Sequence, residues 1–168
     1  MAWAQRSVLP VASSSANQRF ADAARALGLD PDITRFPENT RTAPEAAAAI
    51  GCELGQIVKS LVFACDGEPV LVLTSGSNQV DTAKVGELLG GEIDRADASA
   101  VRDATGFAIG GVPPFGHTTS TRTLLDEDLL QYDVVWGAAG TPDTVFPLAP
   151  AQLVTLSGAG VASVRRES

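Results

Sequence analysis

An Asp-Gly dipeptide between two β-rich runs constrains the fold of this chain more than any other feature. The runs extend from Ile57 to Cys65 and from Pro69 to Thr74, with Asp66-Gly67 between them. Asp-Gly in such a context is a strong signal for a tight β-hairpin. The second run is nearly all Val and Leu, which indicates a strand buried on both faces. The pattern therefore predicts a hairpin whose second strand lies inside the protein.

Helical segments and short strands alternate irregularly along the rest of the chain. We expect helices at 16–27, 42–50, 81–89, 98–104 and 150–156, a helical turn at 126–130, and strands at 33–36, 92–95, 118–124, 133–136 and 144–148. This order predicts an α/β (α+β) fold with a mixed, mostly antiparallel sheet and helices packed outside. No linker divides the chain. We expect one domain at 15–162, between a mobile N-terminal tail at 1–14 and a C-terminal tail at 163–168.

Composition excludes several classes of protein. A chain of 168 residues that is 45% hydrophobic suits one globular domain, and no apolar run approaches the length of a membrane helix. The net charge of −8 argues against a protein that coats nucleic acid, although scattered basic residues allow a local rim. Cys52 and Cys65 lack metal-site spacing and the N-terminus does not resemble a signal peptide. We therefore expect a cytoplasmic protein without metal or cofactor.

The segment from Gly106 to His117 is the strongest functional candidate. We expect a short apolar strand, 106–109, followed by a stiff loop in which two glycines precede Val112-Pro113-Pro114. The N–H groups of Gly110, Gly111 and Val112 can then point one way and hold a carbonyl that becomes an oxyanion. The alternative is a tight turn between two strands.

Three single residues have both a functional and a structural interpretation. Lys59 shares a strand face with Ile57, Leu61 and Phe63, so it either points into a pocket or is an ordinary outward-facing lysine. Asp143, on a glycine-rich turn, either caps that turn or takes part in chemistry. His117 is the one histidine of the chain, and either a base or a hydrogen-bonded loop residue. No G-x-S-x-G nucleophile elbow and no phosphate loop are present.

Taken together, these segments resemble the YbaK/prolyl-tRNA editing domain family over about residues 16–160. The marks are Gln56 to Phe63 with its lysine, Pro69 to Thr74, Val80 to Lys84, the Gly-Gly-Val-Pro-Pro turn, and Trp136-Gly137 followed by 145–153. The resemblance implies a curved, barrel-like mixed sheet around a small pocket. It also implies hydrolysis of the ester that joins a small wrong amino acid to tRNA, on tRNA-Pro or a similar tRNA.

The resemblance also assigns roles to residues. Catalytic roles fall to Lys59, which contacts the terminal nucleotide, and to Gly110 and Gly111, which hold the carbonyl, while water or a substrate group attacks. Substrate-binding roles fall to Val112, Pro113, Pro114, His117, Gly137 and Asp143. Trp136 departs from a Ser-Gly-Gly type turn in some relatives, so the amino-acid preference does not carry over. The implied partners are the CCA end of aminoacyl-tRNA and a synthetase or elongation factor. A non-catalytic binding module and a small-molecule esterase are the alternatives.

Overall fold

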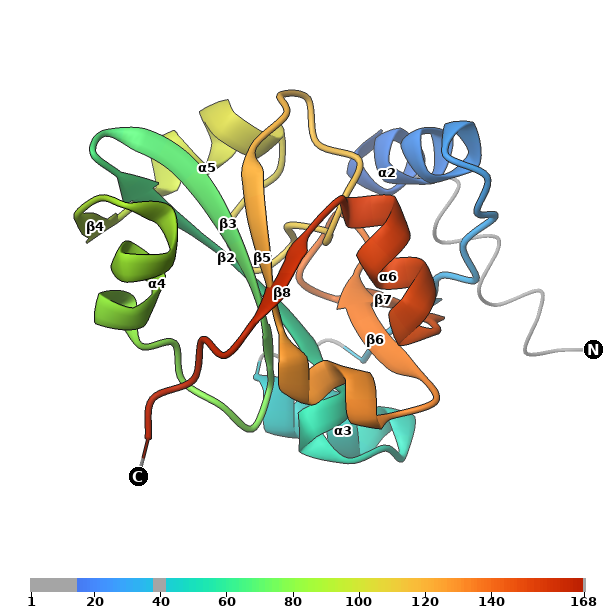
Figure 1. The fold of residues 1–168 in the computed structure, drawn as a ribbon. Coiled ribbons are helices and arrows are strands. Elements are labelled where there is room, and N and C mark those ends of the chain that lie inside the picture. Colours follow the sequence, from blue (N-terminus) through green and yellow to red (C-terminus); the bar gives the residue numbers. More distant parts are fainter. Residues whose placement is uncertain (1–14, 38–41, 168) are drawn as a thin grey trace, which may run out of the picture.

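The predicted hairpin forms the centre of the larger of two sheets. The computed structural model describes residues 15–37 and 42–167 (Figure 1). Strands β2 (Val58–Cys65) and β3 (Glu68–Ser75) pair antiparallel, with Val58 opposite Ser75. Asp66 and Gly67 both have positive φ, 50° and 85°, as a type I′ hairpin turn requires. Every residue of β3 from Val70 to Ser75 is buried, as the run of Val and Leu predicts.

The larger sheet has the strand order β4-β2-β3-β5-β8. Strand β4 (Ile93–Arg95) pairs antiparallel with β2, whereas β3 pairs parallel with β5 (Arg122–Asp126), and β5 with β8 (Gly160–Ala162). Because β4 has only three residues, it covers β2 only from Phe63 to Cys65. The first part of β2 therefore has an open edge along residues 58–62.

The second sheet is small and antiparallel, in the order β1-β7-β6. Its strands are β1 (Thr34–Arg35), β7 (Thr144–Leu148) and β6 (Val135–Ala138). An isolated parallel bridge from Ile57 to Trp136 links it to the larger sheet. The expected α+β architecture with outer helices is confirmed, but the sheet does not close as a barrel. Past Ile57 the two sheets diverge, and within the described residues no strand fills the gap beside β2.

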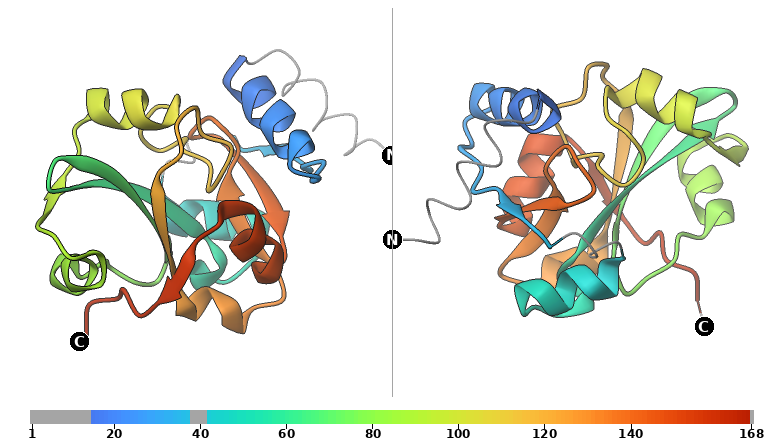
Figure 2. Two further views of the ribbon diagram at one scale, coloured as in Figure 1. Left: turned by 45° about the horizontal axis from the view of Figure 1, so that its top comes forward. Right: turned by 180° about the vertical axis from the view of Figure 1, so that it is seen from behind.

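The predicted helices are all present and lie outside the sheets (Figure 2). They are α2 (Ser15–Ala26), α3 (Ala43–Ile50), α4 (Thr82–Leu89), α5 (Ala98–Thr105) and α6 (Pro150–Ser157), with the short 3-10 helices η1 (Leu54–Gln56) and η2 (Glu127–Gln131). Thr42 and Asp81 cap α3 and α4 as predicted, each accepting a backbone N–H with its side chain. Left-handed glycines end both helices, Gly51 and Gly90.

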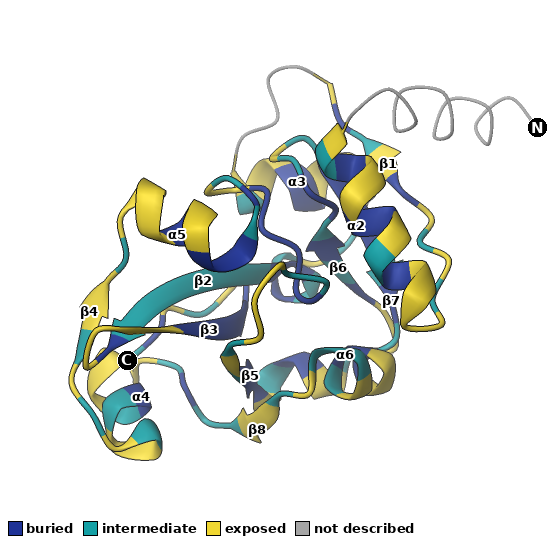
Figure 3. Ribbon diagram, turned by 90° about the horizontal axis from the view of Figure 1, so that it is seen from above, coloured by how far each residue is buried: buried dark blue, intermediate teal, exposed yellow. Residues whose placement is uncertain are grey.

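The two faces of β2 pack into different hydrophobic clusters. Val58 belongs to the main core and Val62 packs against it, and the rings of Phe20, Phe115 and Phe146 meet in the same core. The neighbouring strand β3 is buried along most of its length (Figure 3). On the opposite face of β2, Leu61 and Phe63 pack into a second cluster together with Val85 of α4 and Val164. A side chain on β2 therefore faces either the main core or α4, depending on whether its number is even or odd.

Three local expectations are wrong. Residues 106–109 form no strand, because Gly106 ends α5 with a φ of 84° and Phe107 turns into the core. The strand predicted at 118–124 is β5, which begins only at Arg122. The residues expected as a C-terminal tail are packed, since Val164 is fully buried and Arg165 bridges to Val80. The N-terminal tail predicted at 1–14 lies outside the described residues. None of the described helices is long and apolar enough to cross a membrane.

Candidate active site

A cleft of about 490 Å³ lies along the open edge of β2. Strand β6 and the loop after α5 complete its walls. Most of the lining is apolar and includes Phe36, Val101, Ile109, Trp136 and Val145, while Lys59, Ser60 and Arg95 supply polar atoms. None of its described lining residues carries a carboxylate. The cleft has the size and the mainly apolar character of a small-ligand site.

Two backbone donors of the glycine-proline loop are free at this cleft. Gly110 has a φ of 87° and lines the cleft together with Val112. Among the residues that the structure describes, the N–H groups of Gly110 and Val112 have no hydrogen-bond partner. The N–H of Gly111 instead donates to the carbonyl of Ala108 at 2.9 Å. The expectation of three aligned donors is therefore corrected to two, because the central N–H closes the turn.

Gly111 serves close packing between two loops. A Cβ added at Gly111 would lie 2.7 Å from Thr141 Cα and 2.9 Å from the Gly140 oxygen. Only glycine allows the backbones of these loops to approach so closely. The neighbouring residue Pro142 lines the cleft opposite Gly110. Gly111 thus fixes the distance between two walls of the cleft.

The remaining loop residues lie behind the cleft. Pro113 and Pro114 are buried, and a Cβ on Gly137 of β6 would come within 3.1 Å of the Pro114 ring. The ring Nε2 of His117 forms a 2.6 Å hydrogen bond with the carbonyl of Pro113. Burial lowers the pKa of His117, and the bond to Pro113 only partly offsets this. His117 lines a separate hollow beside α2, so the structure does not bring it together with Lys59.

Strand β6 and the loop after it contribute some residues to the cleft and others to the packing around it. Trp136 and Ala138 line the cleft, so the Trp reduces its volume rather than packing behind it. Asp143 accepts from Arg35 Nη1 at 2.6 Å and from Thr141 Oγ1 at 2.7 Å. Burial raises the pKa of Asp143, but these two partners outweigh it and hold the pKa below its ordinary value. These contacts agree with the turn-capping interpretation of Asp143, which does not line the cleft.

Lys59 lines the cleft, and its side chain leaves β2 on the same face as Leu61 and Phe63. Its Nζ donates to the backbone carbonyl of Asn78 at 2.9 Å. Burial lowers the pKa of Lys59, and the negative charge of Asp126 opposes this shift. The ammonium is therefore held at one rim of the cleft by a neutral oxygen.

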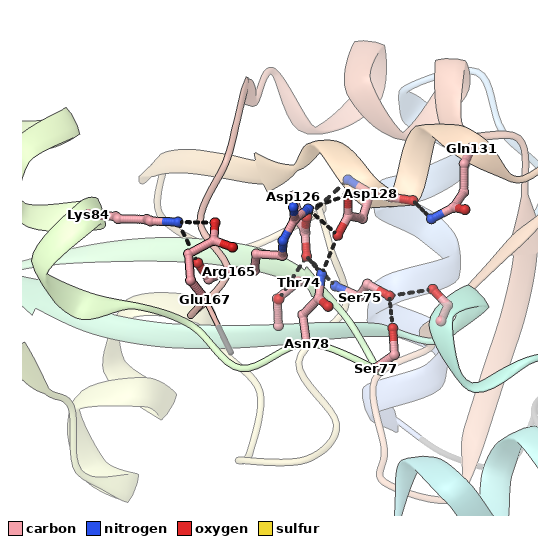
Figure 4. A network of polar contacts seen from close by, with 11 residues as sticks. Thr74, Ser75, Ser77, Asn78, Lys84, Asp126, Asp128, Gln131, Arg165 and Glu167 are labelled. Carbon is pink, nitrogen blue, oxygen red and sulfur yellow. Dashed lines mark hydrogen bonds and ion pairs between the residues drawn. The ribbon is translucent and has the colours of Figure 1, made fainter.

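A buried carboxylate anchors the loop that carries this oxygen (Figure 4). Asp126, at the end of β5, is fully buried. Its Oδ2 accepts from Thr74 Oγ1 at 3.1 Å, from the Ser75 N–H at 3.0 Å and from Asn78 Nδ2 at 2.8 Å. Asn78 Nδ2 also donates to Asp128, which Arg165 holds through two 2.8 Å bonds. Sequence reasoning missed this network; the one signal was an Asp directly after two leucines.

Ser60, which sequence reasoning also missed, follows Lys59 in β2 and lines the cleft. Its Oγ is buried and, within the described part of the chain, is the one such side-chain atom that lacks a hydrogen-bond partner. The carbonyl of Ile57 faces the side of β3, because it accepts from the N–H of Gly76, directly after β3, at 2.7 Å. By antiparallel alternation, the backbone groups of Ser60 and Val62 then point to the open edge. The edge of β2 thus offers unpaired backbone groups to the cleft.

The basic residues considered for a rim are dispersed. Arg95 lines the cleft with Lys59. Lys84 instead pairs with Glu167 at 2.9 Å, and Arg122 donates to the Leu89 carbonyl at 3.3 Å. Arg41 lies outside the described residues. Among the described residues, the structure thus brings Lys59 and Arg95 to the cleft.

The fold and the cleft define the class of protein. Residues 37–156 match the family described as the aminoacyl-tRNA editing domain, and the chain therefore belongs to this family. The family resemblance expected from the motifs is confirmed. With this membership, the activity expected from the motifs, deacylation of mischarged aminoacyl-tRNA, is the activity of this chain.

Individual relatives agree with this assignment. YwhH, an uncharacterised protein of Bacillus subtilis, is 32% identical over 127 residues, which cover 75% of this chain and 81% of that protein. The proline--tRNA ligase of Maridesulfovibrio salexigens is 35% identical over 99 residues, 58% of this chain but only 17% of the ligase. A crystal structure described as a candidate trans-editing enzyme for prolyl-tRNA synthetase superposes with a TM-score of 0.89. That structure is 46% identical and covers 92% of this chain and 99% of its own.

Proposed function

We propose that this protein hydrolyses, in trans, the ester between a small non-cognate amino acid and the CCA end of a tRNA. The aminoacyl carbonyl lies against the free N–H groups of Gly110 and Val112. Lys59 donates from the rim of the cleft to the terminal nucleotide. The attacking atom comes from water or from the substrate, because the described residues that line the cleft carry no thiol and no carboxylate.

The observation that carries this proposal is a pair of backbone N–H groups, without a hydrogen-bond partner among the described residues, on two residues that line the same cleft as Lys59. Donors that are fixed before the reaction stabilise a developing oxyanion without any cost of reorganisation. Loss of one such donor typically raises the barrier by about 3–4 kcal/mol. An aminoacyl ester is already activated, so positioning and two donors suffice without covalent catalysis.

The expected substrates carry a small side chain. Trp136 and Val145 narrow the apolar part of the cleft, and Gly110 and Pro142 approach each other across it. A sieve of this kind complements a synthetase, which gains only about 1–3 kcal/mol of discrimination from one methylene group. A relative of Enterococcus faecalis, EbsC, is named as a candidate Cys-tRNA(Pro)/Cys-tRNA(Cys) deacylase, with 26% identity over 131 residues. Together with the prolyl-tRNA synthetase relatives, it makes mischarged tRNA-Pro the first substrate to test.

The partner is aminoacyl-tRNA, and we further propose that a synthetase or an elongation factor presents its CCA end. A net charge of −8 argues against a large basic field, and within the described part of the chain Lys59 and Arg95 are the basic side chains that line the cleft. Intrinsic affinity for tRNA is therefore expected to be low. Delivery by a second protein would overcome this weakness.

Deacylation of a panel of mischarged tRNAs tests the proposal. The panel contains tRNA-Pro charged with cysteine, alanine, serine and proline, and each ester is followed under single-turnover conditions with excess protein. We expect fast release of small wrong amino acids and slow release of proline. Binding of the charged tRNAs without accelerated release would instead support the non-catalytic module. Rapid cleavage of simple amino-acid esters without tRNA would support the small-molecule esterase.

A further inference from the structure

We propose that Asp126 is a positioning residue for Lys59, acting through the loop of Asn78. It holds the Asn78 carbonyl against the ammonium group, and its negative charge lies on the Asn78 side of that cation. This inference rests on the proposed role of Lys59 in binding the terminal nucleotide. It assigns a function to a buried carboxylate that does not itself line the cleft.

The position of Asp126 follows from the parallel pairing of β3 and β5. Leu73 lies opposite Leu125 in this pair, so the end of β3 lies beside Asp126. Thr74, on the face of β2 and β3 that carries Lys59, donates to Asp126 through its hydroxyl. The carboxylate therefore lies beneath the chain reversal that follows β3.

Asn78 links Asp126 to Lys59 through hydrogen bonds. Its side chain donates to Asp126 and to Asp128, at 2.8 Å each, and its N–H donates to the Ser75 carbonyl at 2.9 Å. Because its side-chain amide and its backbone N–H are both hydrogen-bonded, Asn78 has little freedom to rotate. Its carbonyl oxygen therefore stays fixed at 2.9 Å from Lys59 Nζ. An ammonium group has three N–H donors, so two remain for a ligand.

The balance of charge points in the same direction. All the groups that donate hydrogen bonds to Asp126 are uncharged. They are the Thr74 hydroxyl, the backbone N–H groups of Ser75 and Asp128, and the side-chain amide of Asn78. Arg165 neutralises Asp128 instead, through two 2.8 Å bonds. A fully buried carboxylate is unfavourable unless a positive charge compensates it.

Lys59 is the cation that compensates the negative charge of Asp126. Among the described residues, the hydrogen bonds of Asn78 lead to the charged groups Asp126, Asp128 and Arg165, and Arg95 also lines the cleft. Because Lys59 bonds to a carbonyl and not to a carboxylate, its charge stays available to a phosphate of the substrate. The buried Asp126 carboxylate thus stabilises the positive charge of Lys59 while leaving two of its N–H donors for a ligand.

The chain offers a direct measurement, because Lys59 and Lys84 are its only lysines. Protein labelled with ¹³C at the lysine ε carbon gives two signals, whose shifts report the two ammonium pKa values. In Asp126→Asn we expect the pKa of Lys59 to fall, because the substitution removes the negative charge that opposes the effect of burial. The Lys84 signal, from a side chain paired with Glu167, serves as the internal reference. Thr74→Val is the matched control, since it removes one hydrogen bond to Asp126 but no charge.

An activity cycle separates positioning from a merely structural role. We expect Asp126→Asn to reduce deacylation about tenfold or more in the wild-type background and less than about twofold in Lys59→Ala. Asn78→Ala retains the buried charge, so it serves as a second variant if Asp126→Asn does not fold. It should sharpen the Lys59 signal through greater mobility and lose activity only when Lys59 is present.

Two results would overturn the inference. One is a Lys59 pKa that is unchanged in Asp126→Asn together with an unaltered Lys59 signal in Asn78→Ala. The other is an equal loss of activity from these substitutions with and without Lys59. The NMR measurement needs no substrate. A protein that deacylates no tRNA would therefore contradict the proposed function, whereas the link between Asp126 and Lys59 would still be decided.

Discussion

Replacement of Gly111 by alanine should separate two walls of the cleft. The new Cβ would lie 2.7 Å from Thr141 Cα, 2.9 Å from the Gly140 oxygen and 2.9 Å from the Thr141 carbonyl carbon. All three neighbours are backbone atoms, which cannot rotate away as a flexible side chain can. Carbon atoms pack best at about 3.5–4.0 Å, so the two loops must move apart by roughly 1 Å.

The size of the effect follows from this displacement. Overpacking of a well-packed site destabilises a protein by about 1–3 kcal/mol. For a domain of this size that corresponds to a fall in Tm of roughly 3–10 °C. Activity should fall further, because a misplacement of about 1 Å can reduce a rate about a hundredfold. Gly110 and Pro142 line the cleft on the two displaced loops, so the loss arises from their separation.

Urea unfolding and single-turnover deacylation measure the two effects in Gly111→Ala. Gly110→Ala is the comparison, because its Cβ would make only an ordinary 3.5 Å contact with Pro142 but its φ is 87°. Gly28→Ala, with a φ of 98° and no atom within 4 Å, gives the cost of the left-handed backbone alone, about 1–2 kcal/mol. A Gly111→Ala protein with wild-type stability and activity would refute the assigned packing of the two loops.

Three further predictions concern single groups and the tRNA contact. Ser60→Ala should leave the free energy of unfolding unchanged or raise it by up to about 1 kcal/mol, because the Ser60 hydroxyl lacks a hydrogen-bond partner among the described residues. Ser75→Ala should lower the free energy of unfolding by about 1–3 kcal/mol, because it removes the hydrogen bond to the Gly55 carbonyl. His117 should titrate by NMR with a pKa below about 6.5, and urea unfolding should show stability lost as the pH falls from about 6.5 through the folded pKa, a loss absent in His117→Gln. In a salt series, the slope of log K for tRNA against log salt should be about −2 to −4, and a much steeper slope would contradict a contact confined to the cleft rim.

Local signals made most of the fold predictable. The Asp66-Gly67 turn, the Thr42 and Asp81 caps and the glycines that end α3 and α4 all depend on neighbouring residues. Because such interactions depend only on short stretches of sequence, the helices and the hairpin were predicted with boundaries close to the observed ones. Strand β8 and the packed Val164 were missed because their partners lie far away in the sequence.

The candidate site was predictable only in part, for the same reason. Lys59, Gly110 and Val112 do line one cleft, as the motifs indicate. The partner of each group could not be predicted, because the Gly111 amide closes a turn and His117 bonds to Pro113. The network of Asp126 and Asn78 depends on the parallel pairing of β3 with β5, which no local pattern specifies. Failure of the sheets to close likewise depends on the short β4, which leaves β2 with an open edge.

The most direct test of the central claim compares the two lysines of the chain. Single-turnover release of cysteine from Cys-tRNA(Pro), or of the small amino acid preferred in the panel, is measured for wild type, Lys59→Ala and Lys84→Ala. We expect Lys59→Ala to slow release by about two orders of magnitude or more, since the substitution removes the ammonium donor at the rim of the cleft. Lys84→Ala should retain the wild-type rate, because that side chain pairs with Glu167 away from the cleft. Equal rates for Lys59→Ala and wild type would contradict the account.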